Sequence, residues 1–260
     1  MSPDVAIGGF HANSGSLLVC LVSLGLGWAA HRLAFFSTTT ARPTTRFTAD
    51  PTAAHLAPLV AITLTAMATG AATRGGFDVL YGARVLVAAA VLWVFREAYD
   101  ARGWTWRDAW PAAGTGVGAF VLWLALALAT PAHAGDPVAD GVAALAAPER
   151  GVWLAVRLLG AVVAAPIAEE LAFRGYLARR LAGRDFTAVD PTKLGWLAIA
   201  TSSLLFGLMH DRVVAGTAAG VLYALAYRRR GSLGDAVVAH ATTNLLLVSV
   251  VLATGRWSLW

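Results

Sequence analysis

The sequence predicts an all-α fold, a polytopic integral membrane protein with about eight transmembrane helices. Hydrophobic residues make up 58% of the 260 positions. Charged residues make up only 13%, about half of the roughly 25% that is usual in soluble domains. The apolar residues also gather in stretches close to the ~20 residues that one helix needs to cross a bilayer. Together these observations exclude an ordinary soluble domain.

Eight apolar segments follow one another along the chain. They cover residues 15–35, 53–72, 79–96, 111–130, 151–181, 194–211, 213–228 and 234–253. Polar stretches such as STTTARPTTRFTAD and REAYDARGWTWRD separate them, and the fifth segment is unusually long. Because no soluble domain or internal repeat interrupts the pattern, we expect a single membrane domain, 1–260. Its N-terminal transmembrane helices occupy 1–145, and a catalytic core occupies 146–256.

Basic residues are distributed unevenly between the loops. The loops after the odd-numbered segments hold thirteen Arg and Lys residues, and the regions after the even-numbered segments hold four. The positive-inside rule therefore places the odd loops in the cytoplasm and both termini outside. Trp104, Trp106 and Trp110 suit an interfacial aromatic belt. The net charge of +5 then reflects cytoplasmic loops, and no nucleic-acid partner is expected.

Several smaller features favour structural roles. The single cysteine, Cys20, lies in an apolar run and cannot form an internal disulfide. The first fifteen residues contain no Lys or Arg, so no cleavable signal peptide is expected. The GTGVG stretch at 114–118 lacks the spacing of a dinucleotide-binding loop. Gly216 and Gly220 form a G-x-x-x-G pair, which predicts close packing of two membrane helices.

Ionisable side chains inside apolar segments are costly, so they are functional candidates by default. The fifth segment carries Glu169, Glu170 and Arg174, the sixth ends in His210, and the eighth carries His240 and Asn244. Arg84 and Arg157 also lie in segments, and we interpret them as structural, either snorkelling or paired. The candidates therefore concentrate in the second half of the chain.

Spacing separates the two adjacent acids. Glu170 and Arg174 are four residues apart with the acid first, which predicts a helical ion pair. Glu169 lies about 100° further round the helix and need not join that pair. His240 and Asn244 share one face of their helix, as do Phe206 and His210 of theirs. The SLGD stretch at 232–235 has the form of a capping box and predicts a helix start at Ser232.

Depth along the helices is compatible with one site. At ~1.5 Å per residue from the cytoplasmic ends, Glu169, His240 and Asn244 lie roughly 12–18 Å deep and His210 roughly 25 Å. A carboxylate in an apolar site acts as a general base, and a histidine can relay its proton. An amide and a second imidazole can donate hydrogen bonds to an oxyanion, while an arginine keeps the other carboxylate ionised. These are the parts of a peptide hydrolase that activates water directly.

Three linked motifs carry a family resemblance. Glu169-Glu170-x-x-x-Arg174, Phe206-x-x-x-His210 and His240-x-x-x-Asn244 match the order and spacing of the CPBP (Abi) family. This family comprises the type II CAAX-prenyl-protease-like intramembrane endopeptidases. The resemblance covers about residues 150–255. The stretch from His210 to Leu247 is similar to the CAAX-protease-related branch found beside exosortase sorting systems.

The resemblance implies a role for each motif residue. Glu169 with His210 would activate the attacking water, and His240 with Asn244 would form the oxyanion hole. Glu170 and Arg174 would support the site, and Phe206 would pack beside it. The implied class is a glutamic-type peptidase without a cofactor. Zinc held by Glu169, His210 and His240 is the alternative, although no H-E-x-x-H motif is present.

Other functions remain open at this stage. A proton-coupled transporter also places paired charges in a helical bundle, and a catalytically idle family member could serve as a membrane scaffold. The motifs of serine-type and site-2-type intramembrane proteases are absent from this sequence. Tyr99-Asp100 and SLGD match the motifs of aspartyl-type intramembrane proteases only in part. The expected partners are the lipid bilayer, a membrane-associated protein or peptide substrate, and exosortase-type sorting components. The expected location is the bacterial inner membrane.

Overall fold

The computed structural model describes residues 47–73, 76–99, 109–129 and 137–259. Every regular element within these ranges is a helix, which confirms the all-α class. The main helices are α3 (Pro51–Ala72), α4 (Gly82–Val94), α5 (Trp110–Leu128), the continuous helix Ala147–Ala182, α10 (Trp196–Leu208), α11 (Val213–Arg230) and α12 (Leu233–Thr254). They match seven of the eight predicted segments, and the first, 15–35, lies outside the described residues.

Length and composition mark several of these helices as membrane spans. Four are long and apolar enough to cross a bilayer: Pro51–Ala72, Trp110–Leu128, Ala147–Ala182 and Leu233–Thr254. The helices Gly82–Val94 and Trp196–Leu208 are shorter but also apolar. The described chain is therefore a polytopic membrane-type bundle.

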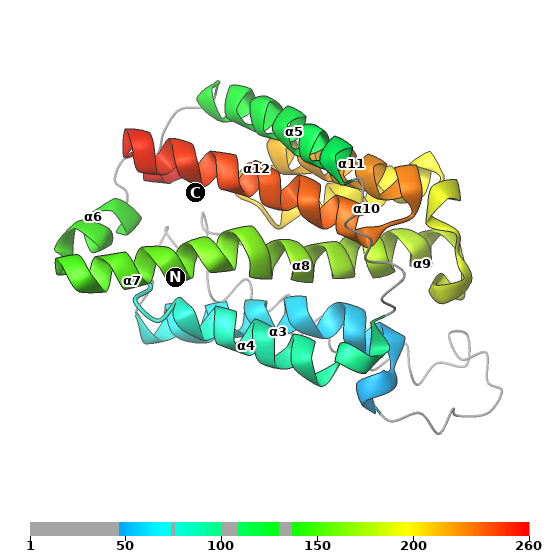
Figure 1. Ribbon diagram of the computed structural model, residues 1–260, viewed down its shortest axis with the longest axis horizontal. Helices are drawn as coiled ribbons and strands as arrows, with labels where there is room; N and C mark the ends of the chain where they lie inside the picture. The colour runs from blue at the N-terminus through cyan, green and yellow to red at the C-terminus, as the bar shows by residue number, and fades with distance from the viewer. Residues whose placement is uncertain (1–46, 74–75, 100–108, 130–136, 260) are drawn as a thin grey trace, which may run out of the picture.

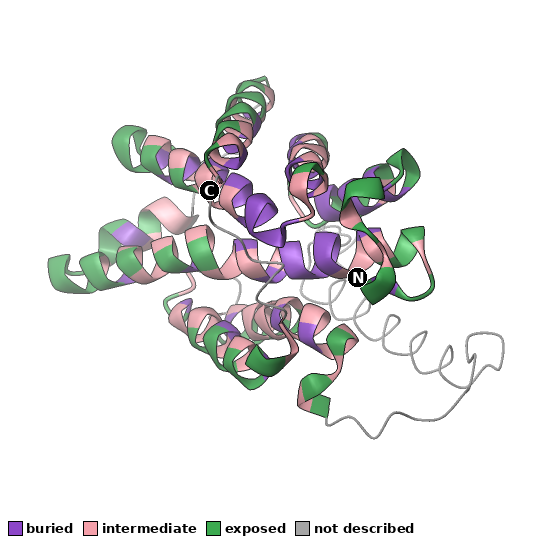
Figure 2. Ribbon diagram, turned by 45° about the vertical axis from the view of Figure 1, so that its right-hand side comes forward, coloured by how far each residue is buried: buried purple, intermediate pink, exposed green. Residues whose placement is uncertain are grey.

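The continuous helix divides the bundle into two groups (Figure 1). The α3–α4 pair lies on one side of it, and α5, α10, α11 and α12 lie on the other. Buried residues collect where α11 and α12 meet the middle of this helix, and the outward faces are exposed (Figure 2). Apolar outer faces around a buried polar centre are expected for a protein dissolved in lipid.

The continuous helix contains two stretches of π-helix. It is built from α7 (Ala147–Leu159), α8 (Ala165–Glu170) and α9 (Arg179–Ala182), joined by π-helical Gly160–Ala164 and Leu171–Ala178. Pro166 has no N–H for the hydrogen-bond ladder, and it directly follows the first π-helical stretch. Segments of this kind are frequent at functional sites. Glu169 and Glu170 lie between the two stretches.

Two local predictions need correction. The polar stretch predicted to be a loop at 131–141 contains a short helix, α6 (Pro137–Ala144). Helix α12 does begin after Ser232, as predicted. Within the described residues, however, the Ser232 side chain makes no capping hydrogen bond, and the Asp235 carboxylate accepts two from Arg230 at 2.6 and 2.9 Å. A guanidinium is a stronger partner for that carboxylate than a backbone amide.

The two ends of the bundle differ in charge. We call the end that holds the start of α3, the α4 terminus, α9 and the α11–α12 turn the basic end. One cavity at this end is lined by residues of all four, including Pro51, Ala98, Arg179 and Gly231. Eight described basic residues belong to it: Arg96, Arg179, Arg180, Arg184, Lys193, Arg228, Arg229 and Arg230. The opposite end holds three: Arg150, Arg212 and Arg256.

Glycines set the closest helix contacts. A methyl group at Gly216 would lie 3.0 Å from the Gly207 Cα, and one at Gly220 would lie 3.1 Å from the Ser203 Cβ. The predicted packing role of this glycine pair is therefore confirmed, with α10 as the partner. Gly116 of the GTGVG stretch is tighter still, because a methyl group there would lie 2.3 Å from the Ala239 carbonyl oxygen on α12.

Candidate active site

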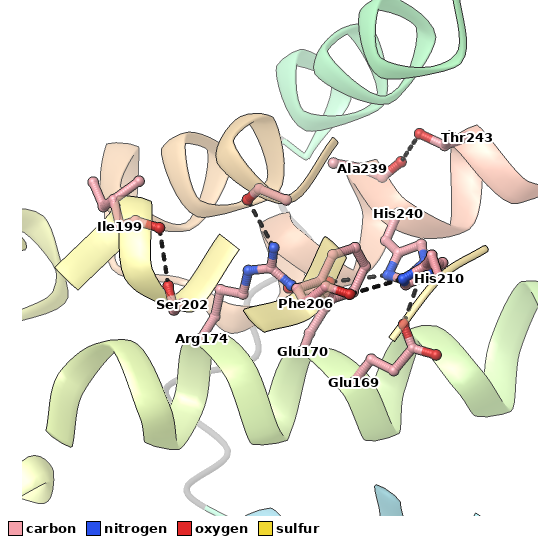
Figure 3. Close-up of polar contacts among 11 residues, drawn as sticks. Glu169, Glu170, Arg174, Ile199, Ser202, Phe206, His210, Ala239, His240 and Thr243 are labelled. Atoms are coloured by element: carbon pink, nitrogen blue, oxygen red, sulfur yellow. Dashed lines mark hydrogen bonds and ion pairs between the residues drawn. The ribbon is translucent and has the colours of Figure 1, made fainter. Parts of the chain in front are cut away.

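The centre of the site is a buried ion pair. Arg174 Nη1 donates to Glu170 Oε1 at 3.0 Å, as the spacing predicted, and both side chains are fully buried. The same Glu170 oxygen accepts from His240 Nδ1 at 2.9 Å. Figure 3 shows these contacts as dashed lines, and the one from His240 joins α12 to the continuous helix. A carboxylate that accepts from two donors is fixed in one orientation.

Arg174 is enclosed on its other faces. Its Nη2 donates to the Gly220 carbonyl oxygen at 2.7 Å. The guanidinium carbon lies 4.5 Å from the centroid of the Phe206 ring and 5.6 Å from that of Tyr223. Aromatic faces stabilise a cation that has lost its water. Gly220 therefore has a second function, because a side chain there would lie 3.0 Å from Arg174 Nη2.

Glu169 is turned away from this pair, as predicted. Its Oε2 lies 3.9 Å from His240 Nε2, and its side chain is 16% exposed, whereas that of Glu170 is fully buried. Among the described residues, Oε2 of each acid has no hydrogen-bond partner, but Glu170 accepts two hydrogen bonds through its Oε1. The two acids therefore have different environments: one is locked in a network, and the other is available.

A cavity of about 160 Å³ brings the sequence-predicted residues together. Its lining comprises Trp123, Ala161, Glu169, Phe206, His210, Tyr223, His240, Asn244, Leu247 and Leu259. At roughly 30 Å³ per water molecule, this volume is that of about five waters. The predicted convergence of Glu169, His210, His240 and Asn244 is present. Glu170 and Arg174 lie behind the cavity wall.

The two histidines make different polar contacts. His210 Nδ1 lies 2.8 Å from the Phe206 carbonyl oxygen, which can only accept, so this nitrogen carries the proton and Nε2 is an acceptor. His240 Nδ1 donates to Glu170, which leaves its Nε2 facing Glu169. The resemblance implied that His210 activates water together with Glu169, and this role stays a prediction; the ionisable group that faces Glu169 directly is His240, at 3.9 Å.

Asn244 is anchored to the continuous helix. Its Nδ2 donates to the Ala161 carbonyl oxygen at 2.8 Å, inside the first π-helical stretch. An amide nitrogen has two N–H groups, so one remains beyond this bond. Asn244 therefore joins α12 to the continuous helix and still lines the cavity.

Tyr223 is a site residue that the sequence reasoning missed. Its ring stacks on that of His240, with centroids 4.6 Å apart and planes 15° from parallel. It also lines the cavity and is almost fully buried. The available signal was its position three residues after Gly220, which places both on one helix face.

A second charged cluster lies nearer the opposite end. Arg84 and Asp78 form an ion pair, and Asp78 also accepts from Thr69 Oγ1 at 2.9 Å. The Asp78 carbonyl oxygen accepts from Trp153 Nε1 at 3.0 Å. The Arg157 guanidinium lies 4.6 Å from the Tyr81 ring centroid. These contacts fit the structural interpretation of Arg84 and Arg157.

A zinc site receives no geometric support. Within the part of the chain that the structure describes, no group of three His, Cys, Asp or Glu side chains is arranged to hold a metal ion. Two of the alternative ligands approach each other, with Glu169 Oε2 3.9 Å from His240 Nε2.

Together, the helices and the cavity define a polytopic membrane protein with a buried Glu–His–Arg network beside a polar cavity. The family model described as "Type II CAAX prenyl endopeptidase Rce1-like" matches residues 151–246. This stretch contains all three motifs and runs from α7 into α12. The match supports a CAAX-protease-like function for this stretch of the chain. The chain matches no curated protein and no solved structure.

Proposed function

We propose that this protein is an intramembrane endopeptidase that hydrolyses a peptide bond with water activated by Glu169. One observation carries the proposal: a single cavity holds Glu169, His210, His240 and Asn244 against the buried Glu170–Arg174 pair. These are groups that can act as base, acid and hydrogen-bond donors for hydrolysis without a serine or cysteine nucleophile.

The charges of the network balance with one shared proton. Glu170 and Arg174 neutralise each other, so Glu169 and the Nε2 of His240 together need one proton for overall neutrality. That proton can reside on either group, since they face each other across 3.9 Å. A buried cluster is least costly when it is neutral, and both placements meet this condition.

Hydrolysis begins with the proton on His240. Glu169 takes a proton from water as the water oxygen attacks the carbonyl carbon, and the O–H that remains on this oxygen donates a hydrogen bond to His210 Nε2. His240 Nε2–H and the remaining N–H of Asn244 donate to the developing oxyanion. Glu169 then gives its proton to the leaving nitrogen as the C–N bond breaks. The products are a carboxylic acid and an amine, and the site returns to its starting state.

Glu170 and Arg174, which lie behind the cavity wall, and Phe206, which lines the cavity, position these groups. Glu170 fixes the His240 tautomer through Nδ1, and Arg174 holds Glu170 in place. Phe206 lies between Arg174 and both histidines, with ring centroids 4.5 Å from His210 and 5.6 Å from His240. Efficient proton transfer requires that the general base and the hydrogen-bond donors are held in position.

The remaining assignments belong to the same proposal. The enzyme is of the glutamic type, works without a cofactor and is located in a bacterial inner membrane. Its substrate is a membrane-associated protein or peptide, and an exosortase-type sorting system is a proposed partner. A proton-coupled transporter or an idle scaffold is the competing function.

Replacing Glu169 with alanine tests the proposal. We expect membranes containing the wild type to show new protein termini that are missing with the Glu169→Ala variant. N- and C-terminal proteomics of both membranes, at matched protein levels, is the measurement. Glu149→Ala is the control, because this exposed acid belongs to the same continuous helix but not to the cavity. Identical termini in wild type and Glu169→Ala would reject peptidase activity and favour a transporter or scaffold.

A further inference from the structure

The catalytic cavity extends from Glu169 in one direction only. On the continuous helix, Ala161 precedes Glu169 and lies nearer the opposite end of the bundle. On α12, Asn244 and Leu247 follow His240 toward that same end. Leu259 follows α12 in the chain and packs with Ala127 and Val251 near that end. The cavity therefore runs from the buried network toward the end away from the basic loops.

Side chains fill the space between the catalytic cavity and the basic end. Arg174, Phe206 and Tyr223 form a layer there, each at most 2% exposed. Figure 3 places Arg174 on one side of Glu170 and Glu169 on the other along the helix. Beyond this layer comes an apolar cluster that includes Leu194 and Tyr227, also buried. No open path to the basic end is therefore present among the described residues.

The basic end has a cavity of its own, and it is separate. It is lined by Gly175, Arg179 and Tyr227 among others and, as far as the described residues go, shares no lining residue with the catalytic cavity. Arg174 precedes Gly175 directly along the helix. The buried layer thus stands between two cavities that face different ends.

The inner side of the site is more buried than the residues around Glu169, and the apolar Leu247 and Leu259 farther out are buried again, at 6% and 8% exposed. Residues of the network on the inner side of the site are buried: Glu170, Arg174, Tyr223 and His240. Glu169, His210, Asn244 and Ala161 are intermediate. The outer walls of the cavity are apolar, formed by Trp123, Leu247 and Leu259. Such walls fit an unfolded peptide segment with an apolar side chain next to the bond to be cut.

We infer that substrate enters from the end opposite the basic loops, and that the substrate is an exported or outward-facing apolar peptide segment. The inference rests on the proposed peptidase function, which requires a substrate. It also rests on the basic loops being cytoplasmic. A cytosolic chain terminus, presented at the basic end, would meet the buried layer of Arg174, Phe206 and Tyr223 instead of Glu169. The cavity thus selects its substrate by the side of the membrane on which it is presented.

Sided labelling of single cysteines tests the inference without requiring activity. Starting from Cys20→Ser, one variant carries Ala161→Cys in the cavity and another carries Thr187→Cys at the basic end. A membrane-impermeant charged thiol reagent is added to right-side-out and to inverted vesicles. We expect Ala161→Cys to be labelled only in right-side-out vesicles and Thr187→Cys only in inverted ones. If Ala161→Cys does not fold, Leu247→Cys supplies the same measurement.

Each other outcome overturns the inference. Labelling of Ala161→Cys only in inverted vesicles means that the cavity opens to the cytoplasm. Labelling of Thr187→Cys only in right-side-out vesicles means that the basic end faces outward, so the substrate side is reversed. Failure of the peptidase proposal is recognised separately, because it shows as unchanged termini in the Glu169→Ala membranes while the labelling pattern stays the same.

Discussion

Two arginine–carboxylate pairs of this chain have different surroundings. In the Glu170–Arg174 pair both side chains are fully buried, and the carboxylate also holds His240. In the Asp78–Arg84 pair the side chains are 14% and 25% exposed, and the pair links the α3–α4 turn to the continuous helix. Charges in the first environment depend wholly on each other, whereas the second pair is partly exposed at the surface of the bundle. Burying the Glu170–Arg174 pair costs desolvation free energy, and its place beside the cavity indicates that it positions the catalytic groups. The Asp78–Arg84 pair indicates a role in holding the helices together.

The largest effect is expected from breaking the buried pair. Arg174→Met leaves Glu170 as an uncompensated charge and should lower the free energy of unfolding by about 3–5 kcal/mol. Thermal unfolding in detergent measures this loss. The double variant Glu170→Gln with Arg174→Met removes both charges and should recover most of it. A double variant as unstable as the single one would contradict the buried-charge explanation.

The adjacent acids should separate stability from activity. Glu169→Gln is expected to reduce peptide cleavage by about 10²–10⁴-fold, the usual contribution of a general base, and to leave the melting temperature unchanged. Glu170→Gln should reduce cleavage and also lower the melting temperature, because Arg174 loses its counter-charge. Cleavage assays and melting curves on both variants decide the matter. Equal melting temperatures would remove the distinction between them.

The close contact between α5 and α12 at Gly116 should have the next largest effect on stability. Gly116→Val forces α5 away from the Ala239 backbone on α12 and should cost about 1–3 kcal/mol, as overpacking does. Gly118→Val is the matched control, since a side chain there meets nothing within 4 Å. Both are glycine-to-valine changes in one helix, so the difference in melting temperature isolates the contact. No difference would mean that α5 and α12 can separate freely.

The exposed pair should matter less. Arg84→Met removes a partly exposed partner of Asp78 and should cost about 1–2 kcal/mol. Because the pair lies outside the catalytic cavity, cleavage per folded molecule should stay at the wild-type level. Comparison with Arg174→Met under the same conditions is the measurement. An equal loss of stability from both variants would make the two pairs equivalent.

The smallest effect is a pH dependence at the basic end. Thr187 donates to Asp185 through its hydroxyl at 2.6 Å and its N–H at 3.0 Å, which holds the pKa of Asp185 below its ordinary 3.8. A lowered pKa adds stability above 3.8 that is lost as the pH falls through the lowered value. Asp185→Asn should flatten this acidic loss in melting temperature. An unchanged acidic slope would show that the turn contributes nothing.

Local sequence patterns predicted the local features of the site. The spacing of Glu170 and Arg174 predicted their ion pair, and the glycine spacing predicted the α10–α11 contact at Gly216 and Gly220. These features depend on neighbours within one or two turns of one helix, where the helical period fixes the geometry. The hydrogen bond between Glu170 and His240 spans seventy residues and was not predicted.

The sequence by itself determined the class of protein, the position of its described helices to within a few residues, and which polar side chains lie at membrane depth. Hydropathy and the helical repeat carry this information, because they act along one helix axis. Only the tertiary structure decided that His240 rather than His210 meets Glu169, that Tyr223 stacks on it, and that the cavity runs away from the basic end. These depend on how each helix is rotated about its own axis. That rotation is set by close contacts between helices, such as those at Gly116 and Gly220.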